Sequence, residues 1–154
     1  SFNTIFTNIQ NLTQPKMREL ENLQQGSLTN GEKIYLSYKI AGVRKEASLG
    51  FPIIQKALKL LNLNDRDTYI KTLIYIMSLT DDTTIINRKG LEGLNYVKKT
   101  MKNLYENGYD ENTLAKINHQ FIKEGISPGG SADLLCGTIF LSLIKNNIYR
   151  RREK

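Results

Sequence analysis

The chain has 154 residues, of which 40% are apolar and 24% are charged, and its formal net charge is +7. A chain of this length can bury roughly two-thirds of the surface that its unfolded form exposes, which is enough for a core. Its ordinary globular composition excludes a disordered chain and a collagen-like fibre. The single cysteine, Cys136, excludes an intramolecular disulfide framework and a cysteine-based zinc site. The sequence has no apolar run of about 18 residues and no recognisable signal peptide, so we expect a cytoplasmic protein that does not span a membrane.

The basic surplus is concentrated at the C-terminal end. Residues 145–154 contain five basic side chains and one acidic side chain, a surplus of +4, which leaves +3 for the rest of the chain. Positive charge is favourable at the C-terminal end of a helix because of the helix dipole. We therefore interpret residues 145–154 as a basic tail at a helix end, and we do not expect nucleic acid as a partner.

Apolar residues recur at spacings of three and four, which is typical of helices, and no alternating apolar run between turn residues predicts a strand. The pattern is clearest in segments 70–77, 91–105, 114–122 and 134–144. Segment 70–77 is apolar on most sides, which predicts a central buried helix. We predict an all-α fold, a compact multi-helix bundle that forms a single helical domain over residues 1–154.

Helix start and stop signals agree with this pattern. Thr29 followed by Glu32 fits a capping box, and Asn64 and Asp110 are candidate N-cap residues. Gly108 is a candidate helix end, because glycine readily adopts the left-handed conformation found there.

The first candidate site is the segment 127–135, Ser-Pro-Gly-Gly-Ser-Ala-Asp-Leu-Leu. A glycine turn here precedes a helix that we expect to start near Ser131, where free N–H groups and the helix dipole suit a phosphate. Asp133 could bind Mg²⁺ or accept a ligand hydroxyl. The alternative is structural, with Ser131 as an N-cap and Asp133 as an acid favoured by the helix dipole.

The second candidate site is the polar segment 81–90, which we expect to be a loop after an apolar helix. Asp81 and Asp82 repel each other unless a cation or a hydrogen-bond donor compensates. Mg²⁺ prefers carboxylate oxygens and substrate phosphates, and Arg88 can hold phosphate oxygens. The pattern indicates a Mg²⁺–polyphosphate site, and the alternative is a polar helix junction with local salt bridges.

The third candidate site is the segment 42–52, which places Arg44 next to Glu46 between glycines. Taken alone, it is interpreted as a loop with ion pairs. His119 lacks the convergent partners that a zinc site needs, and Cys136 is expected to be buried and inert.

Taken together, the three segments resemble the triphosphoribosyl-dephospho-CoA synthase family. The segment 127–135 looks like the family's signature, and segments 42–52 and 82–94 are similar to two further motifs in the family's order. The resemblance runs from about residue 29 to about residue 144. Thr84, Asn87 and Lys89 depart from the pattern, standing where the family usually has Asn, His and Gly.

Members of this family are about twice as long as the present chain. Two motifs of their first half, Lys-Pro-Gly-Leu-Val and Asn-Thr-His-Lys-Gly, do not occur here. The chain therefore resembles the C-terminal half of such an enzyme, and we expect a missing N-terminal half or a second copy as its partner.

The resemblance implies a transferase that joins ATP to 3′-dephospho-CoA and releases adenine. Its product would be the prosthetic-group precursor for the acyl carrier protein of citrate lyase or malonate decarboxylase. The implied fold has glycine-rich and acidic loops that form a nucleotide site, with Mg²⁺ bound alongside ATP.

The hypothesis assigns each candidate residue a role. Metal binding is assigned to Asp81, Asp82 and Asp133. Catalysis is assigned to Asp82 and Asp133, by stabilising positive charge on the ribose, and to Glu46, as a base or a partner of Arg44. Substrate and phosphate binding is assigned to Arg44, Thr83, Arg88, Gly129, Gly130 and Ser131.

Two other functions stay open. Another Mg²⁺-dependent helical nucleotide enzyme, such as a hydrolase, would use the same acidic segment with water as the acceptor. A non-enzymatic helical module would use its basic tail, and its binding would depend steeply on salt.

Overall fold

The computed structural model describes residues 2–23 and 26–152, with side chains described at 3–23 and 26–147. Within these ranges the chain forms eight α-helices and no strand, which confirms the predicted all-α fold. The helices are α1 (Phe2–Glu21), α2 (Asn30–Tyr38), α3 (Gly42–Ser48), α4 (Pro52–Ala57), α5 (Arg66–Leu79), α6 (Thr83–Asn107), α7 (Glu111–Glu124) and α8 (Gly129–Arg152).

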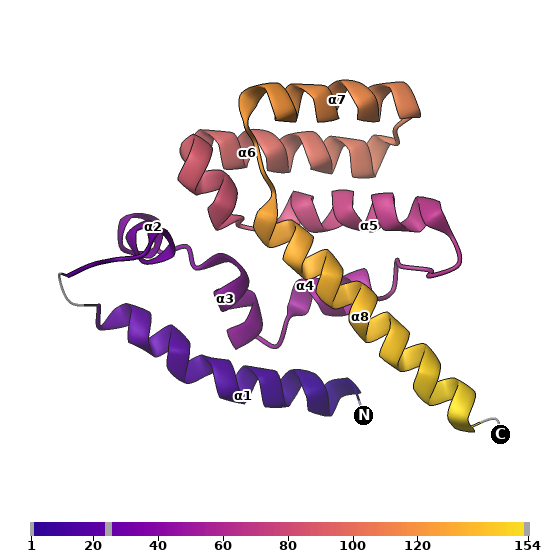
Figure 1. The fold of residues 1–154 in the computed structure, drawn as a ribbon, viewed down its shortest axis with the longest axis horizontal. Helices are drawn as coiled ribbons and strands as arrows, with labels where there is room; N and C mark the ends of the chain where they lie inside the picture. The colour runs from indigo at the N-terminus through magenta and orange to yellow at the C-terminus, as the bar shows by residue number, and fades with distance from the viewer. Residues whose placement is uncertain (1, 24–25, 153–154) are drawn as a thin grey trace.

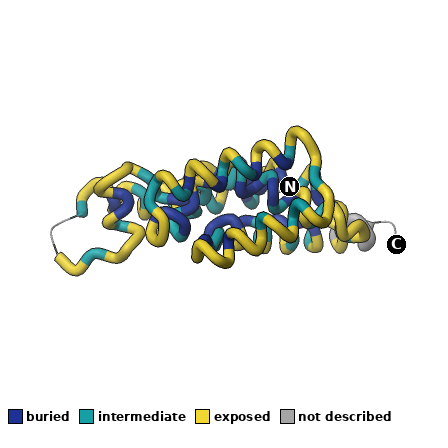
Figure 2. The backbone as a smooth tube through the Cα atoms, turned by 90° about the horizontal axis from the view of Figure 1, so that it is seen from above, coloured by how far each residue is buried: buried dark blue, intermediate teal, exposed yellow. Residues whose placement is uncertain are grey.

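The helices are arranged in stacked layers. In Figure 1, α7, the long part of α6 and α5 lie side by side, α8 runs diagonally across α5 and α4, and α1 lies along α3 at the opposite edge. The buried backbone runs along the middle of the molecule, with exposed residues on the outer helices (Figure 2). This arrangement places the start of α8 beside the start of α6.

Two apolar clusters form the core. One joins α5, α6 and α7 and includes Ile74, Val97 and Phe121. The other joins α1, α4, α5 and α8 and includes Ile76 and Leu134. Because α5 contributes to both clusters, it is the central buried helix that its apolar pattern predicted.

Most of the predicted helix boundaries are confirmed. Thr29 and Glu32 form the capping box, and Asp110 caps α7. The start of α5 differs by one residue, because Asp65 rather than Asn64 accepts a hydrogen bond from the Asp67 N–H at 3.0 Å. Asn64 instead lies in the preceding turn.

The two polar segments that were expected to be loops are largely helical. Residues 42–48 form α3, and helix α6 begins at Thr83, directly after Asp82. Gly90 interrupts α6 with a φ of 67°, a conformation that favours glycine, and this produces the kink seen in Figure 1. The candidate side chains of both segments therefore lie on or next to helices rather than on loops.

The expectation that Cys136 is buried is wrong, because its side chain is exposed. Helix α8 packs against the core through Leu134 and Leu141. Cys136 follows Leu134 by two positions, so it lies on the opposite, outward side of the helix. The predicted basic tail is the end of α8 as far as Arg152, and its side chains from residue 148 onwards lie outside the described residues.

No helix in the described part of the chain is long and apolar enough to cross a membrane. The expected cytoplasmic location stays a prediction.

Candidate functional site

Asp82 directly precedes helix α6, and its carboxylate caps the start of that helix. Asp82 is the N-cap residue, and its Oδ1 accepts a hydrogen bond from the Thr84 N–H at 3.0 Å. This is the usual way in which an aspartate satisfies one of the free donors at a helix start. Only 1% of Asp82 is exposed to solvent, so its charge must be compensated by protein groups.

The same carboxylate also binds the start of helix α8. Oδ1 accepts from the Gly130 N–H at 3.3 Å, and Oδ2 accepts from the Ser131 N–H at 2.8 Å and from the Ser131 hydroxyl at 3.0 Å. The positive ends of two helix dipoles therefore face one buried negative charge. Asp82 thus fastens α6 to α8.

Glycines allow this close approach. A Cβ atom on Gly130 would lie 3.2 Å from the Asp82 carboxylate, and one on Gly129 would lie 2.9 Å from the Thr84 hydroxyl. Gly42, at the start of α3, has a φ of +52°, and a Cβ there would lie 3.0 Å from Thr83. The glycine-rich turn therefore packs against α6, and the N–H groups of Gly130 and Ser131, expected to bind phosphate, donate to Asp82.

A cavity of about 230 Å³ lies beside this junction. It contains Arg44, Thr83, Gly130 and Asp133, so residues from all three predicted segments meet in one place. Its complete lining comes from α1, α2, α3, α6, α8 and the residue before α3: Leu20, Gly31, Ala41, Val43, Arg44, Thr83, Thr84, Gly130 and Asp133.

The charged groups of this cavity are available to a ligand. Arg44 and Asp133 are both exposed, and neither forms an ion pair within the described part of the chain. The pKa of Glu32 is lowered, chiefly by hydrogen bonds with Thr29 and to a smaller extent by the positive charge of Arg44. The cavity therefore offers a cation, a carboxylate and threonine side chains to one bound molecule.

Other predicted site residues lie outside the cavity. Ser131 is buried against Asp82, and Arg88 is exposed on α6 and is not among the lining residues. Asp81 forms an ion pair with Lys98 at 2.6 Å. Since the described residues contain no group of three or more His, Cys, Asp or Glu side chains placed to hold a metal ion, Asp81, Asp82 and Asp133 do not form a three-carboxylate metal site.

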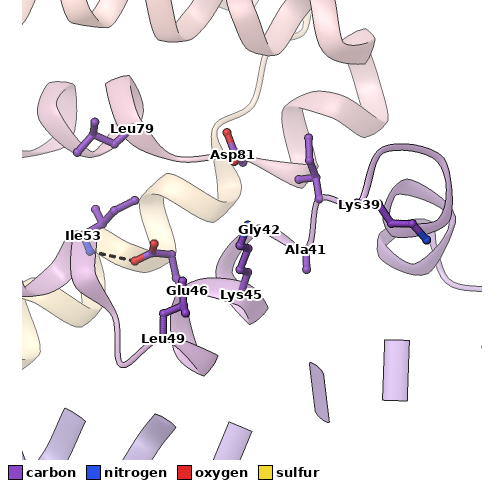
Figure 3. Close-up of a pocket in the computed structure, with 10 residues that line it drawn as sticks. Lys39, Ala41, Gly42, Lys45, Glu46, Leu49, Ile53, Leu79 and Asp81 are labelled. Atoms are coloured by element: carbon purple, nitrogen blue, oxygen red, sulfur yellow. Dashed lines mark hydrogen bonds between the residues drawn. The ribbon is translucent and has the colours of Figure 1, made fainter. Parts of the chain in front are cut away.

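Glu46 lies in a second cavity of about 190 Å³, which Asp81 also lines (Figure 3). Its Oε2 accepts a hydrogen bond from the Ile53 N–H at 3.0 Å, at the start of α4. The N-cap residue of α4, Phe51, makes no side-chain cap, so Glu46 supplies one from the preceding helix. Burial raises the pKa of Glu46 above its ordinary value, and the negative charge of Asp81 raises it further, while the Ile53 N–H opposes the shift.

Several cavity residues were not predicted from the sequence. Thr84 carries a visible signal, since it stands where the chain departs from the family's pattern. Leu20 and Gly31 come from segments without a recognisable motif, and only the fold brings them to the cavity.

The fold and the site define a class: an all-α protein whose polar cavity forms where the starts of three helices meet. A family model described as CitG, ATP:dephospho-CoA triphosphoribosyl transferase, matches residues 4–152. The chain belongs to this family.

Curated relatives agree with the family assignment. A 2-(5″-triphosphoribosyl)-3′-dephosphocoenzyme-A synthase from Pectobacterium atrosepticum is 34% identical over 131 residues, which cover 80% of this chain and 43% of the relative. A protein named "Probable 2-(5″-triphosphoribosyl)-3′-dephosphocoenzyme-A synthase" from Malonomonas rubra is 38% identical over 136 residues, covering 80% of this chain and 43% of the relative. The chain therefore spans less than half the length of these relatives.

A solved structure is also similar. A structure titled "Crystal structure of putative triphosphoribosyl-dephospho-coA synthase from Archaeoglobus fulgidus" matches with a TM-score of 0.57 and 25% sequence identity. The match covers 66% of this chain and 45% of that chain.

The first prediction concerns Asp82. Asp82→Asn should lower the free energy of unfolding by about 3 kcal/mol. The amide NH₂ group would replace one of the two accepting oxygens, so it would face N–H donors and leave them without an acceptor. Asp81→Asn is the matched control, and its exposed ion pair with Lys98 predicts a loss below about 1 kcal/mol. Urea unfolding followed by circular dichroism measures both.

If Asp82→Asn does not fold, Ser131→Ala gives a milder test. It removes only the hydroxyl hydrogen bond to Asp82 and should cost about 1 kcal/mol. Equal stability of Asp82→Asn and Asp81→Asn would contradict the role assigned to Asp82.

The second prediction concerns Glu46. Because its pKa is raised in the folded protein, wild-type Glu46 favours folding at low pH and loses that contribution as the pH rises. Glu46→Gln still accepts from the Ile53 N–H without a buried charge, so it should be at least as stable as wild type near neutral pH. This difference in the free energy of unfolding should shrink as the pH falls from 7 towards 4.5, the ordinary pKa of the group, and should stay constant below it.

Urea unfolding at several pH values between about 4 and 7 measures this difference. A Glu46→Gln variant that is less stable than wild type at neutral pH, with a gap that widens as the pH rises, would show that the charged form is favoured instead.

Proposed function

We propose that this chain carries the nucleotide site of an enzyme that transfers the triphosphoribosyl group of ATP to 3′-dephospho-CoA and releases adenine. The observation that carries the proposal is the single cavity shared by Arg44, Thr83, Gly130 and Asp133. Membership of the family, whose model is described by this reaction, supports it. The activity belongs to a protein about twice as long, so the present chain is proposed to supply part of the active site.

In this proposal, side chains bind the polyphosphate. Arg44 forms paired hydrogen bonds with phosphate oxygens, as guanidinium groups do, and the threonine hydroxyls of the cavity add further donors. A volume of about 230 Å³ is smaller than the roughly 300–1,000 Å³ typical of sites that enclose a whole ligand. The cavity therefore suits one part of ATP, such as its ribose and phosphates.

Asp133 is the carboxylate that we assign to the chemistry. The bond between the ATP ribose C1′ and adenine breaks, and C1′ forms a bond to a hydroxyl oxygen of the acceptor. Positive charge develops on the ribose ring, and a carboxylate in the cavity stabilises it. The acceptor hydroxyl must also lose its proton to a base within hydrogen-bond reach, for which Asp133 is the candidate and Glu46 the alternative.

Asp82 takes a positioning role in this account. Its carboxylate oxygens accept four hydrogen bonds from the protein, so it holds Thr83 and Asp133 in place rather than contacting the substrate.

The donor set fits Mg²⁺ that arrives with ATP. Mg²⁺ usually binds through one or two carboxylates and substrate phosphates, and Asp133 offers one such carboxylate beside threonine hydroxyls. When bound, the ion would neutralise charge on the polyphosphate.

Several parts of the sequence hypothesis stay predictions. These are the correspondence to the C-terminal half of the relatives, the missing half or second copy as partner, phosphate binding by Arg88, and the use of the product for the acyl carrier protein of citrate lyase or malonate decarboxylase. A nucleotide hydrolase would use the same cavity, and release of adenine without dephospho-CoA would favour it.

The third prediction tests the cavity. Arg44→Ala and Asp133→Asn should each weaken Mg²⁺-dependent ATP binding to the 154-residue chain about tenfold or more. Arg44→Ala removes hydrogen bonds between charged groups that contribute about 1.5–3 kcal/mol each, and Asp133→Asn removes a carboxylate ligand of Mg²⁺. Arg66→Ala, an exposed arginine at the start of α5, is the control and should bind as wild type does. Isothermal titration calorimetry measures the dissociation constants.

Two results would count against the proposal. Absence of ATP binding to the folded wild-type chain would remove the nucleotide site from it. Equal losses in Arg44→Ala and Arg66→Ala would place the site outside this cavity.

A further inference from the structure

An apolar groove of about 280 Å³ continues from the nucleotide cavity. Val43 and Asp133 line both spaces, so the groove begins where the polar cavity ends. Its walls come from α1, α4 and α8, which contribute Ile9, Ile54 and Phe140 among other apolar side chains. A molecule bound in the cavity can therefore extend into the groove past Asp133.

The lining of the groove restricts what can bind there. Asp133 is the one polar side chain among its lining residues. A base or a phosphate placed deep in the groove would lose hydrogen bonds to water without replacement, at a cost of a few kcal/mol. The groove therefore favours a chain of methylene and methyl groups attached to a polar head.

The groove is also open to water along one side. Phe140, in its α8 wall, keeps 62% of its surface exposed. Amide groups of a bound chain can thus remain hydrated while methyl and methylene groups contact Ile9 and Ile54.

We infer that this groove binds the pantetheine arm of the acceptor, dephospho-CoA. The inference rests on the proposed function, in which ATP and dephospho-CoA are the two substrates. ATP has no aliphatic part, whereas dephospho-CoA carries an arm of methylene groups and a dimethyl-substituted carbon beyond its diphosphate. With the arm in the groove, the diphosphate leads to Asp133, where the acceptor ribose meets the ribose of ATP at the edge of the polar cavity.

This placement gives the groove a role in selecting the acceptor. ATP and dephospho-CoA share adenosine and phosphates, so the polar cavity alone distinguishes them poorly. An apolar groove adds binding energy for dephospho-CoA only, because each buried methylene contributes about 0.8 kcal/mol. Discrimination between the two substrates then depends on side chains that never contact phosphate.

The test compares dephospho-CoA with ADP, which has the same adenosine and diphosphate but no arm. Calorimetric titrations use the 154-residue chain with a reductant, because Cys136 and the ligand both carry thiols. Wild type should bind dephospho-CoA about tenfold more tightly than ADP. Phe140→Ser should lose most of this preference while its affinity for ADP stays unchanged.

Leu143→Ser is the matched control, since Leu143 is 48% exposed on the same helix and is not among the groove residues. It should keep the full preference. Ile9→Ser makes the α1 wall of the groove polar and should repeat the effect of Phe140→Ser.

Equal affinities of wild type for ADP and dephospho-CoA would overturn the groove assignment and leave the proposed function standing. A preference that survives in both Phe140→Ser and Ile9→Ser would overturn it as well. If sedimentation shows a dimer that these variants dissociate, a second copy occupies the groove and the inference is wrong. Failure of both ligands and ATP to bind would contradict the proposed function itself.

Discussion

The buried Asp82 carboxylate fastens two helix starts that are 48 residues apart in the sequence, and the geometry of the candidate site depends on this contact. Because this contact joins the two helix starts, Thr83 of α6 and Asp133 of α8 line the same cavity. Gly42 lets the start of α3 pack closely against Thr83, and this places Arg44 at the cavity as well. The site is therefore built on helix termini rather than on flexible loops. Rigid helix starts hold side chains more precisely than mobile connections do.

The three carboxylates Asp82, Glu46 and Asp133 divide into two groups according to the groups that they contact. Asp82 and Glu46 accept hydrogen bonds from helix N-termini and stabilise the local fold. The Asp133 side chain lines the cavity and forms no hydrogen bond or ion pair with the described part of the chain. The proposed chemistry is therefore assigned first to Asp133 and Arg44, and the buried Asp82 carboxylate is assigned a positioning role.

The sequence predicts the parts of this structure that depend on local rules. The spacing of apolar residues predicts the helices, and the side chains of Thr29 and Asp110 predict two of their starts, because capping involves residues only two or three positions apart. The three motifs also point to one shared site. The hydrogen bonds from Gly130 and Ser131 to Asp82 join residues far apart in the sequence, so no short sequence pattern predicts them. The sequence therefore predicts a phosphate site at N–H groups that already donate to Asp82.

A crystal structure of the 154-residue chain with Mg²⁺ and ATP tests the central claim most directly. The account predicts phosphate oxygens bound by the Arg44 side chain, while the Ser131 N–H still donates to Asp82. Phosphate accepting hydrogen bonds from the N–H groups of Gly130 and Ser131, with Asp82 displaced towards the ligand, would contradict it.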